Sequence, residues 1–298
     1  VPPPAGGWED ELSKEPQRSR SMSIDSNGTD MSRCESVCDT EEEYDFDDDD
    51  ARSVTSETAV RRPKSAHDYE SALERLRAKD PHLKHIMLRG CKLGDEGVIE
   101  LANALDGGFK GLKKLDLAWN DMTEKGCRVL CKALAGCKNL TCIIFNKNSI
   151  GDKGAKAVAD LMKPEPKITK VELIGNKIGE KGATLLVEAL MKNKKIKRLH
   201  LGGNEVGDAG AKQLAELIMK NVALRQVFLA HNGITDKGAK MLAHAMKVNS
   251  KIDELDLFNN TNIGEKGAKA IDDAMNNPIW FVRLPNQQTT AGLIGSLT

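Results

Sequence analysis

The chain has 298 residues, and its 44 Lys and Arg balance its 44 Asp and Glu, so the formal net charge is zero. The charge is unevenly placed: residues 1–60 contain 17 acidic and 5 basic side chains (net −12), and the remainder contains 27 and 39 (net +12). No apolar run approaches the roughly 20 residues that span a bilayer, so we expect no membrane contact. The seven cysteines lack the spacing of secreted disulfide frameworks, which favours a reducing, cytoplasmic location.

Residues 1–64 are predicted to form a disordered acidic tail. They are rich in Ser, Asp, Glu, Pro and Gly and hold too few apolar residues to offset the entropy of ordering. An acidic run, Thr40–Asp50, contains Tyr44 and Phe46, and Ser21 and Ser23 follow arginines in a pattern typical of kinase sites. We expect the tail to modulate access of a partner to the basic remainder, and phosphorylation to add negative charge.

Residues 65–82 are predicted to form an N-terminal capping helix. Ala72, Leu73 and Leu76 share one helical face, and Pro81 is expected to end the helix. Such a helix would cover the open edge of the repeats that follow, as the end of a solenoid requires.

Residues 83–286 contain seven copies of one repeat, of which Ile196–Asn221 is the clearest. One apolar position recurs with separations of 29 and then five times 28 residues, occupied by Leu88, Leu117, Phe145, Leu173, Leu201, Leu229 and Leu257. Alternating apolar residues predict a short strand, and the G-x-x-x-L-A-x-L run after it predicts a helix. Stacked units of strand, loop, helix and loop bury a continuous core, which indicates a solenoid.

The pattern I-x-x-L-x-L-x-x-N followed by this helix resembles the leucine-rich repeat of the ribonuclease-inhibitor subtype. The resemblance implies an α/β horseshoe with a parallel sheet on its concave face and helices on its convex face. The spacing of Ile279, Val282 and Leu284 predicts a terminal strand without a helix, and residues 287–298 are predicted to be a loose tail. Trp280 and Phe281 are expected to cover the last open edge.

Two further positions recur in every unit. Buried amides are expected to satisfy backbone groups where each strand turns away, at Asn120, Asn148, Asn176, Asn204 and Asn232, with Cys91 in that buried place in the first unit and either Asn260 or Asn262 in the seventh. A glycine precedes each helix, at Gly97, Gly126, Gly154, Gly182, Gly210, Gly238 and Gly267, and allows either tight packing or an unusual φ.

The segment Ser71–Pro81, S-A-L-E-R-L-R-A-K-D-P, is similar to the one that leads into the repeat domain of tropomodulins. Because that family caps actin pointed ends, this similarity implies a cytoskeletal alternative. The Ran GTPase-activating protein is built from similar repeats, which implies regulation of a small GTPase as a further alternative. The repeats also resemble those of nucleotide-binding receptors in innate immunity.

The leading hypothesis is a non-catalytic module that binds a protein partner on the concave strand face. Large apolar residues in solvent-facing positions there would mark a binding site, with Trp119 and Phe228 as its hot spots. The alternative is that these residues pack on one another across adjacent strands. The predicted partner-binding residues are Met87, Arg89, Asp116, Trp119, Ile144, Asn146, Glu172, Ile174, His200, Phe228, His231, Asp256 and Phe258.

No catalytic motif is recognised in the sequence, and the histidines fall in separate units, so we expect no enzyme activity, cofactor or metal. Lysines recur at the helix starts, as at Lys153 and Lys156, and they are read as a solvated face rather than a nucleic-acid site because no aromatic residues are interleaved with them. The expected form is a monomer.

Overall fold

The computed structural model describes residues 65–105, 108–163, 167–249, 251–274 and 281–283. In them, nine strands form one sheet, all parallel and in chain order. The strands are β1 Ser65–Ala66, β2 His85–Met87, β3 Lys114–Asp116, β4 Cys142–Ile144, β5 Lys170–Glu172, β6 Arg198–His200, β7 Gln226–Phe228, β8 Glu254–Asp256 and β9 Phe281–Arg283. The helices are α2 Tyr69–Arg77, α3 Gly94–Ala104, α4 Glu124–Leu134, α5 Gly151–Met162, α6 Glu180–Lys192, α7 Gly207–Lys220, α8 Asp236–Val248 and α9 Glu265–Asp272.

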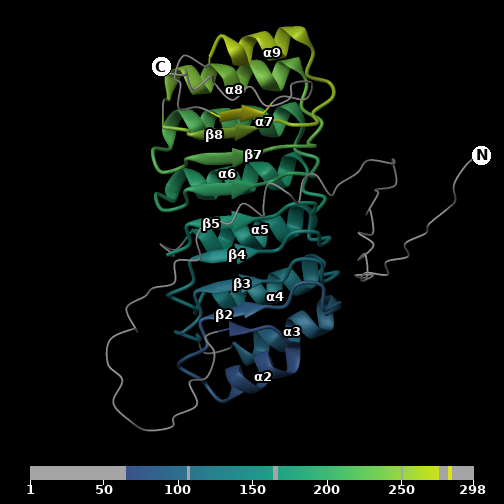
Figure 1. The fold of residues 1–298 in the computed structure, drawn as a ribbon, viewed down its shortest axis with the longest axis vertical. Helices are drawn as coiled ribbons and strands as arrows, with labels where there is room; N and C mark the ends of the chain where they lie inside the picture. The colour runs from purple at the N-terminus through teal and green to yellow at the C-terminus, as the bar shows by residue number, and fades with distance from the viewer. Residues whose placement is uncertain (1–64, 106–107, 164–166, 250, 275–280, 284–298) are drawn as a thin grey trace, which may run out of the picture. The chain divides into compact units, whose positions relative to one another are not determined.

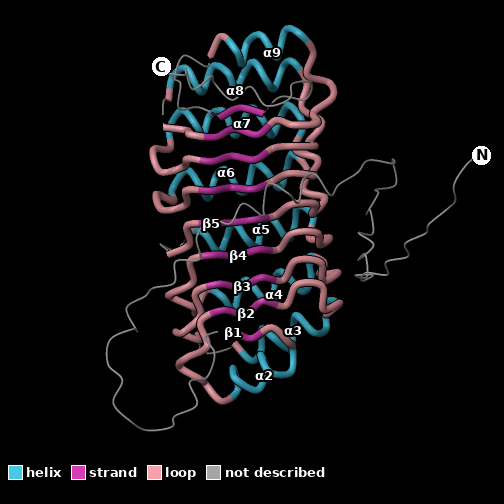
Figure 2. Tube along the Cα trace, viewed as in Figure 1, coloured by secondary structure: helices cyan, strands magenta, loops and turns pink. Residues whose placement is uncertain are grey.

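Strands and helices form two layers. Figure 1 shows helices α3 to α9 stacked along one side of the sheet, and Figure 2 shows the strands as a ladder of short parallel rungs. Each helix contacts the helix of the next repeat, as α7 does with α8. This arrangement confirms the predicted leucine-rich repeat solenoid, in which each unit depends on its neighbours for burial.

The core lies between the layers and runs through all the units. Each strand from β2 to β8 buries its middle residue and leaves its first and third residues on the opposite face, as the two-residue period of a strand requires. The recurring apolar position is fully buried in every unit: Leu88, Leu117, Phe145, Leu173, Leu201, Leu229 and Leu257.

The repeats pair without any slip in register. Glu172 in β5 is opposite His200 in β6, which is opposite Phe228 in β7, so equivalent positions form rows across the sheet. A side chain therefore meets its counterparts from the repeats before and after it, and this geometry decides which predicted site residues are exposed.

Helix α2 is present at the start of the repeats, and its predicted face is buried, with Ala72, Leu73 and Leu76 at most 2% exposed. The helix ends at Arg77, before Pro81, which corrects the predicted end. The chain leaves the helix through a left-handed Lys79 (φ 50°), and an ion pair between Arg75 Nε and Asp80 Oδ2 at 2.8 Å closes the turn. Strand β1, which pairs with β2, was not expected from the sequence.

At the other end, the predicted terminal strand is present as β9, paired in parallel with β8. The predictions for the N-terminal tail, for Trp280 and for residues 287–298 lie outside the described residues. None of the helices in the described part of the chain combines the length and apolar character needed to cross a membrane. The five cysteines within the described residues are free thiols.

The glycines near the helix starts serve tight packing. The Gly238 N–H donates to Asp208 Oδ1 of the preceding repeat at 2.9 Å, and a Cβ at Gly238 would lie 2.6 Å from that oxygen. Asp208 also accepts from the Thr235 N–H at 2.9 Å, so one repeat caps the helix of the next. This resolves the two alternatives in favour of close approach, because Gly238 does not have a positive φ.

Candidate functional site: the sheet face and the strand ends

The predicted binding residues lie on the face of the sheet opposite the helices, or just beyond the ends of the strands. The third residue of each strand from β2 to β8 is one of them: Met87, Asp116, Ile144, Glu172, His200, Phe228 and Asp256. The others follow their strands by two or three residues: Arg89, Trp119, Asn146, Ile174, His231 and Phe258. The structure therefore places all of them on one surface, which we call the sheet face.

The prediction that the apolar members are exposed is wrong for three of them. Ile144, Ile174 and Phe228 are only 5%, 8% and 6% exposed. Because equivalent positions are in register, these side chains pack against their neighbours in the row, and the ring of Phe228 stacks on His200 with centroids 4.4 Å apart and planes 9° apart. Met87 and Phe258 are half-buried, and Trp119 is 38% exposed.

Charged groups in the middle of the sheet face neutralise one another. Glu172 is 1% exposed; its carboxylate pairs with Lys170 Nζ at 2.8 Å and accepts from Asn146 Nδ2 at 2.7 Å. Burial raises the pKa of Glu172, but Lys170 and Asn146 together outweigh it and hold that pKa below its ordinary value. The Glu172 carboxylate has its partners within the chain, so this cluster stabilises the sheet face and does not indicate a ligand site.

His200 is held neutral by its surroundings. Burial lowers its pKa to about 4, and the positive charges of Lys170 and Arg198 act in the same direction against the attraction of Glu172. Its Nδ1 has no hydrogen-bond partner in the structure. His200 is thus mainly a flat partner for Phe228, rather than the rim residue that the sequence suggested.

Two of the predicted carboxylates shape the chain where it leaves the sheet. Asp116 Oδ1 accepts from the Ala118 N–H at 3.0 Å, and Asp256 Oδ1 accepts from the Phe258 N–H at 2.8 Å. A carboxylate that binds its own backbone two residues on stabilises a turn. Arg89 Nε lies 3.7 Å from Asp116 Oδ2, which adds a polar rim next to Trp119.

Sequence reasoning missed a second row on the sheet face, formed by the first residue of each strand: His85, Lys114, Cys142, Lys170, Arg198, Gln226 and Glu254. Arg198 Nε donates to Gln226 Oε1, and Gln226 Nε2 donates to Glu254 Oε2 at 2.8 Å, so the row forms a polar ladder across three strands. The signal was available, because residues two apart in a strand share a face.

The residue three positions after each strand from β2 to β8 has a left-handed backbone conformation. Gly90, Gly175 and Gly203 have φ between 63° and 72°, and the same position is held by Trp119 (φ 61°) and Lys147 (φ 54°). A residue other than glycine is strained in this conformation by about 1–3 kcal/mol. Lys147 Nζ lies 5.3 Å from the centroid of the Trp119 ring, so the partly exposed indole forms a cation–π contact with the Lys147 ammonium group.

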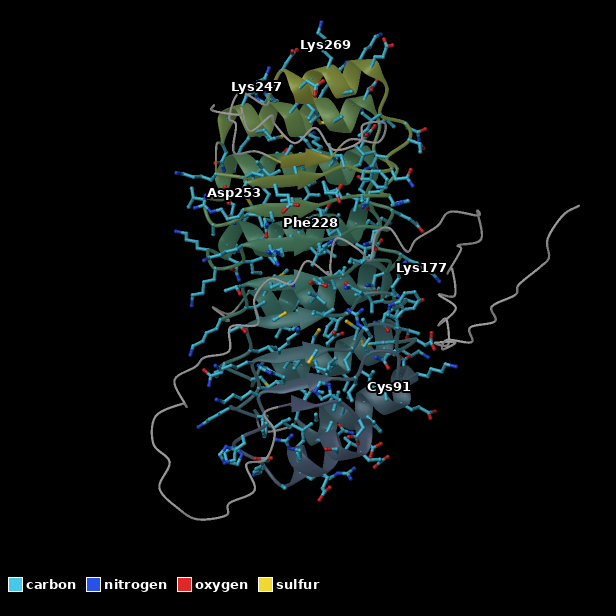
Figure 3. The ribbon with its side chains drawn as sticks, viewed as in Figure 1. Cys91, Lys177, Phe228, Lys247, Asp253 and Lys269 are labelled. Atoms are coloured by element: carbon cyan, nitrogen blue, oxygen red, sulfur yellow. The ribbon has the colours of Figure 1, made fainter. Side chains whose placement is uncertain are left out.

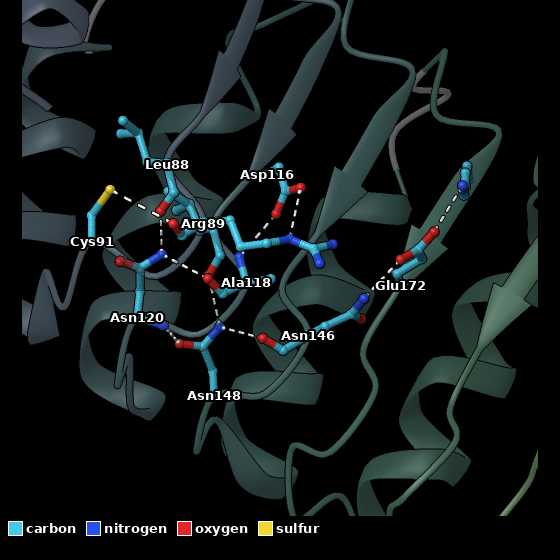
Figure 4. Close-up of polar contacts among 11 residues, drawn as sticks. Leu88, Arg89, Cys91, Asp116, Ala118, Asn120, Asn146, Asn148 and Glu172 are labelled. Atoms are coloured by element: carbon cyan, nitrogen blue, oxygen red, sulfur yellow. Dashed lines mark hydrogen bonds and ion pairs between the residues drawn. The ribbon is translucent and has the colours of Figure 1, made fainter. Parts of the chain in front are cut away.

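Behind this surface, the predicted asparagines form a ladder that Figure 4 shows in part. Asn148 Nδ2 donates to the carbonyls of Leu117 and Phe145, both at 2.9 Å, while its Oδ1 accepts from the N–H groups of Asn120 and Met122 at 3.2 and 2.9 Å. Each amide therefore joins two repeats through backbone groups that would otherwise be unpaired.

The two ends of this ladder settle two expectations. In the seventh repeat Asn260 occupies the position, fully buried and bonded to the carbonyls of Leu229 and Leu257, while Asn262 is exposed. In the first repeat Cys91 is exposed, which contradicts its predicted burial. A thiol is a weak donor, and the first repeat has no earlier repeat whose carbonyls it would join.

Comparisons with known proteins agree with this architecture. The family model described as Leucine Rich repeat matches residues 79–102, 112–131, 136–159, 192–215, 220–243 and 248–271. The family model does not match the repeat that contains β5 and α6, although that repeat has the same strand and helix as the others. None of the curated protein sequences matches the chain significantly.

Two solved structures align with the chain at low TM-scores. One is described as actin-binding site 2 of leiomodin-1, with a TM-score of 0.39 and 16% identity, covering 62% of this chain and 91% of that one. The other is the C-terminal domain of tropomodulin from Caenorhabditis elegans, with a TM-score of 0.35 and 12% identity, covering 70% and 90%. The leucine-rich repeats of the chain, which the family model matches, form a solenoid of one parallel strand layer and one helix layer.

Proposed function

We propose that the chain is a non-catalytic interaction module that binds a protein partner on the sheet face, at the strand ends around Trp119. The observation that carries the proposal is the state of Trp119: a large aromatic side chain, 38% exposed, in a left-handed backbone position that glycine occupies in other repeats. Exposed aromatic side chains with a polar rim are typical binding hot spots.

The surroundings of Trp119 fit this role. Lys147 of the next repeat stands over the ring, and the Arg89–Asp116 pair joins the preceding repeat to the repeat that contains Trp119. A partner would bury the indole at the centre and leave these charges at the rim, where they favour specificity and association rate. Phe228, the second predicted hot spot, is buried against His200, so truncating it would weaken the fold as well as any binding.

The test uses Trp119→Gly. The substitution removes the indole and also relieves the left-handed strain, so the fold is expected to keep its stability or gain some. Binding of a partner captured from lysate and then titrated as a purified protein is expected to weaken by about 2 kcal/mol, or roughly 30-fold. The control is Lys177→Gly, which relieves left-handed strain (φ 57°) at an exposed turn residue two repeats away from Trp119. An unchanged affinity for Trp119→Gly would rule out this surface.

The acidic tail is proposed to modulate access, since residues 1–60 carry a net charge of −12 and the remainder +12. Attraction between the two is screened by salt. Replacing Asp47–Asp50 with asparagine should therefore tighten binding of an acidic partner at low salt and have little effect at high salt. If the variant and the wild type bind the partner with equal affinity at both salt concentrations, the tail does not have this role.

The cytoskeletal alternative rests on the segment Ser71–Pro81, which forms α2 and the turn after it. A pointed-end actin assembly assay tests it directly, and inhibition that α2 variants abolish would favour it over an unrelated partner. Regulation of a small GTPase is tested by stimulated GTP hydrolysis. A monomeric form, a cytoplasmic location and the ribonuclease-inhibitor subtype of the repeats stay predictions from the sequence.

A further inference from the structure

A groove of about 550 Å³ lies at the edge of the sheet where the strands begin. Because the strands are parallel and each helix returns in the opposite direction, the ends of the helices meet the starts of the strands here. The groove spans the segments before β5, β6 and β7, and its basic lining residues are Lys167, Lys194, Lys195, Lys197 and Arg225. Thr169 and Ala223 complete the lining, which contains no acidic side chain.

Three of these cations have no ion-pair partner among the described residues: Lys194, Lys195 and Lys197. The other two are held in place by neutral acceptors. Lys167 Nζ donates to Asn139 Oδ1 at 2.8 Å, and Arg225 Nη1 donates to the Lys251 carbonyl at 2.8 Å. Like charges gathered without counter-charges create a local positive potential that favours anionic partners.

Three lysines on the helix layer do form ion pairs. Lys153 pairs with Glu124 at 2.9 Å, while Lys156 and Lys163 both pair with Asp160, at 2.8 and 2.7 Å. Other exposed lysines, such as Lys181, Lys237 and Lys266, also lack an ion pair among the described residues. The groove differs from them because five basic residues gather around one hollow whose lining contains no acidic side chain. Figure 3 shows nitrogen-tipped side chains projecting along the strand-start edge, on the same side as the labelled Asp253 before β8.

The fold does not require Lys194, Lys195 and Lys197 to stabilise the ends of the neighbouring helices. Cations near the end of a helix offset its dipole, but that effect fades beyond the last turn, which Lys192 and Lys220 already occupy in α6 and α7. The helix-end carbonyls are also satisfied: Asn193 Nδ2 donates to the Met162 carbonyl at 3.1 Å, and Asn221 Nδ2 donates to the Leu190 carbonyl at 2.8 Å. Lys194, Lys195 and Lys197 are therefore not needed to cap these helices.

An apolar residue flanks the charges. Val222, next to the lining residue Ala223, is 64% exposed and belongs to the small set of exposed large hydrophobic residues in the described part of the chain. A ligand that fits both features carries carboxylates and an apolar side chain, as an acidic peptide does. No aromatic side chain lines the groove, whereas sites for single-stranded nucleic acid combine cations with stacking aromatics.

We propose that this groove is a second binding site, which takes an acidic segment of a partner protein. Its carboxylates bind Lys194, Lys195 and Lys197, and an apolar side chain rests on Val222. The site lies at the strand-start edge, while Trp119 lies beyond the strand ends, so this proposal stands independently of the one for the sheet face.

The test measures binding of a fluorescent acidic peptide to the full chain by anisotropy. The sequence Thr40–Asp50 supplies a suitable probe, since it combines an acidic run with Tyr44 and Phe46. Joint replacement of Lys194, Lys195 and Lys197 with glutamine is expected to weaken binding roughly tenfold. Val222→Ser should weaken it by a smaller factor, because only apolar contact is lost.

The control replaces three exposed helix-start lysines, Lys181, Lys237 and Lys266, with glutamine, which removes the same charge elsewhere. Equal losses in both triple variants would overturn the proposal, because binding would then follow net charge alone. Equal binding of a neutral probe with Asn and Gln, or tighter binding of a single-stranded oligonucleotide, would also overturn it. Binding of the probe only after the chain's own run Glu41–Asp50 is neutralised would contradict a partner as the occupant.

Discussion

Polar side chains have different roles at the two edges of the sheet. Where the strands end, asparagine side chains such as Asn148 bond to backbone groups of two repeats. Where the strands begin, Lys194, Lys195 and Lys197 face solvent without counter-charges. The strand-end ladder therefore holds the solenoid together, while the strand-start groove keeps its interactions available for another molecule.

The largest effect is expected from breaking the ladder at Asn148. Asn148→Ala leaves the N–H groups of Asn120 and Met122 and the carbonyls of Leu117 and Phe145 without this partner, which should cost about 3 kcal/mol of unfolding free energy. Urea denaturation followed by circular dichroism measures the loss. Removing a groove lysine should leave the same curve nearly unchanged, because exposed charges contribute little to folding.

Asn176→Ala provides the matched comparison. Its Nδ2 donates to the Phe145 and Ile174 carbonyls, but its Oδ1 has no partner in the structure. We therefore expect a loss of about 1 kcal/mol, at the low end of what an unsatisfied buried amide site costs. Equal losses for Asn148→Ala and Asn176→Ala would contradict the idea that the two N–H groups bonded to Asn148 Oδ1 account for the larger loss.

These edges also show what the sequence could predict. The repeat period placed the buried apolar positions and the asparagines correctly, since both depend on contacts that recur in every unit. Exposure on the sheet face was not predictable in the same way: Ile144 and Phe228 are covered by whichever side chains occupy the neighbouring repeats. The groove was missed because its lysines lie outside the motif, although aligning the repeats brings Lys167 and Lys195 to one position.

A loss between those of the two asparagine variants is expected from the carboxylate that joins adjacent helices. Asp208→Ala removes the acceptor for the N–H groups of Thr235 and Gly238, which should cost about 2 kcal/mol, the upper range for a helix cap. Glu180→Ala is the control, because Glu180 holds the same position one repeat earlier and is exposed. A melting temperature that falls equally in both variants would show that this cap does not join the repeats.

Acid should weaken the fold in two stages. The pKa of Asp208 is lowered: burial raises it, but the hydrogen bonds from Thr235 and Gly238 outweigh that effect. The pKa of Glu172 is lowered as well, so both carboxylates lose their stabilising effect only as pH falls through their folded pKa values, below the ordinary range. His200 acts at higher pH, since its pKa is lowered from 6.5 to about 4.

The effect of His200 on stability is also small and depends on pH. Between pH 6.5 and about 4 the unfolded chain binds a proton at this residue and the folded chain does not, so stability falls as pH falls through that window. Because the ring is only half-buried, we expect roughly 1 kcal/mol between pH 7 and pH 5. His200→Phe keeps a flat ring against Phe228 and cannot titrate, so its melting temperature should stay constant over this window while that of the wild type drops. If both proteins lose stability in parallel, the charge on His200 is tolerated on the sheet face, and that face is more open to water than the strand-end ladder beside it.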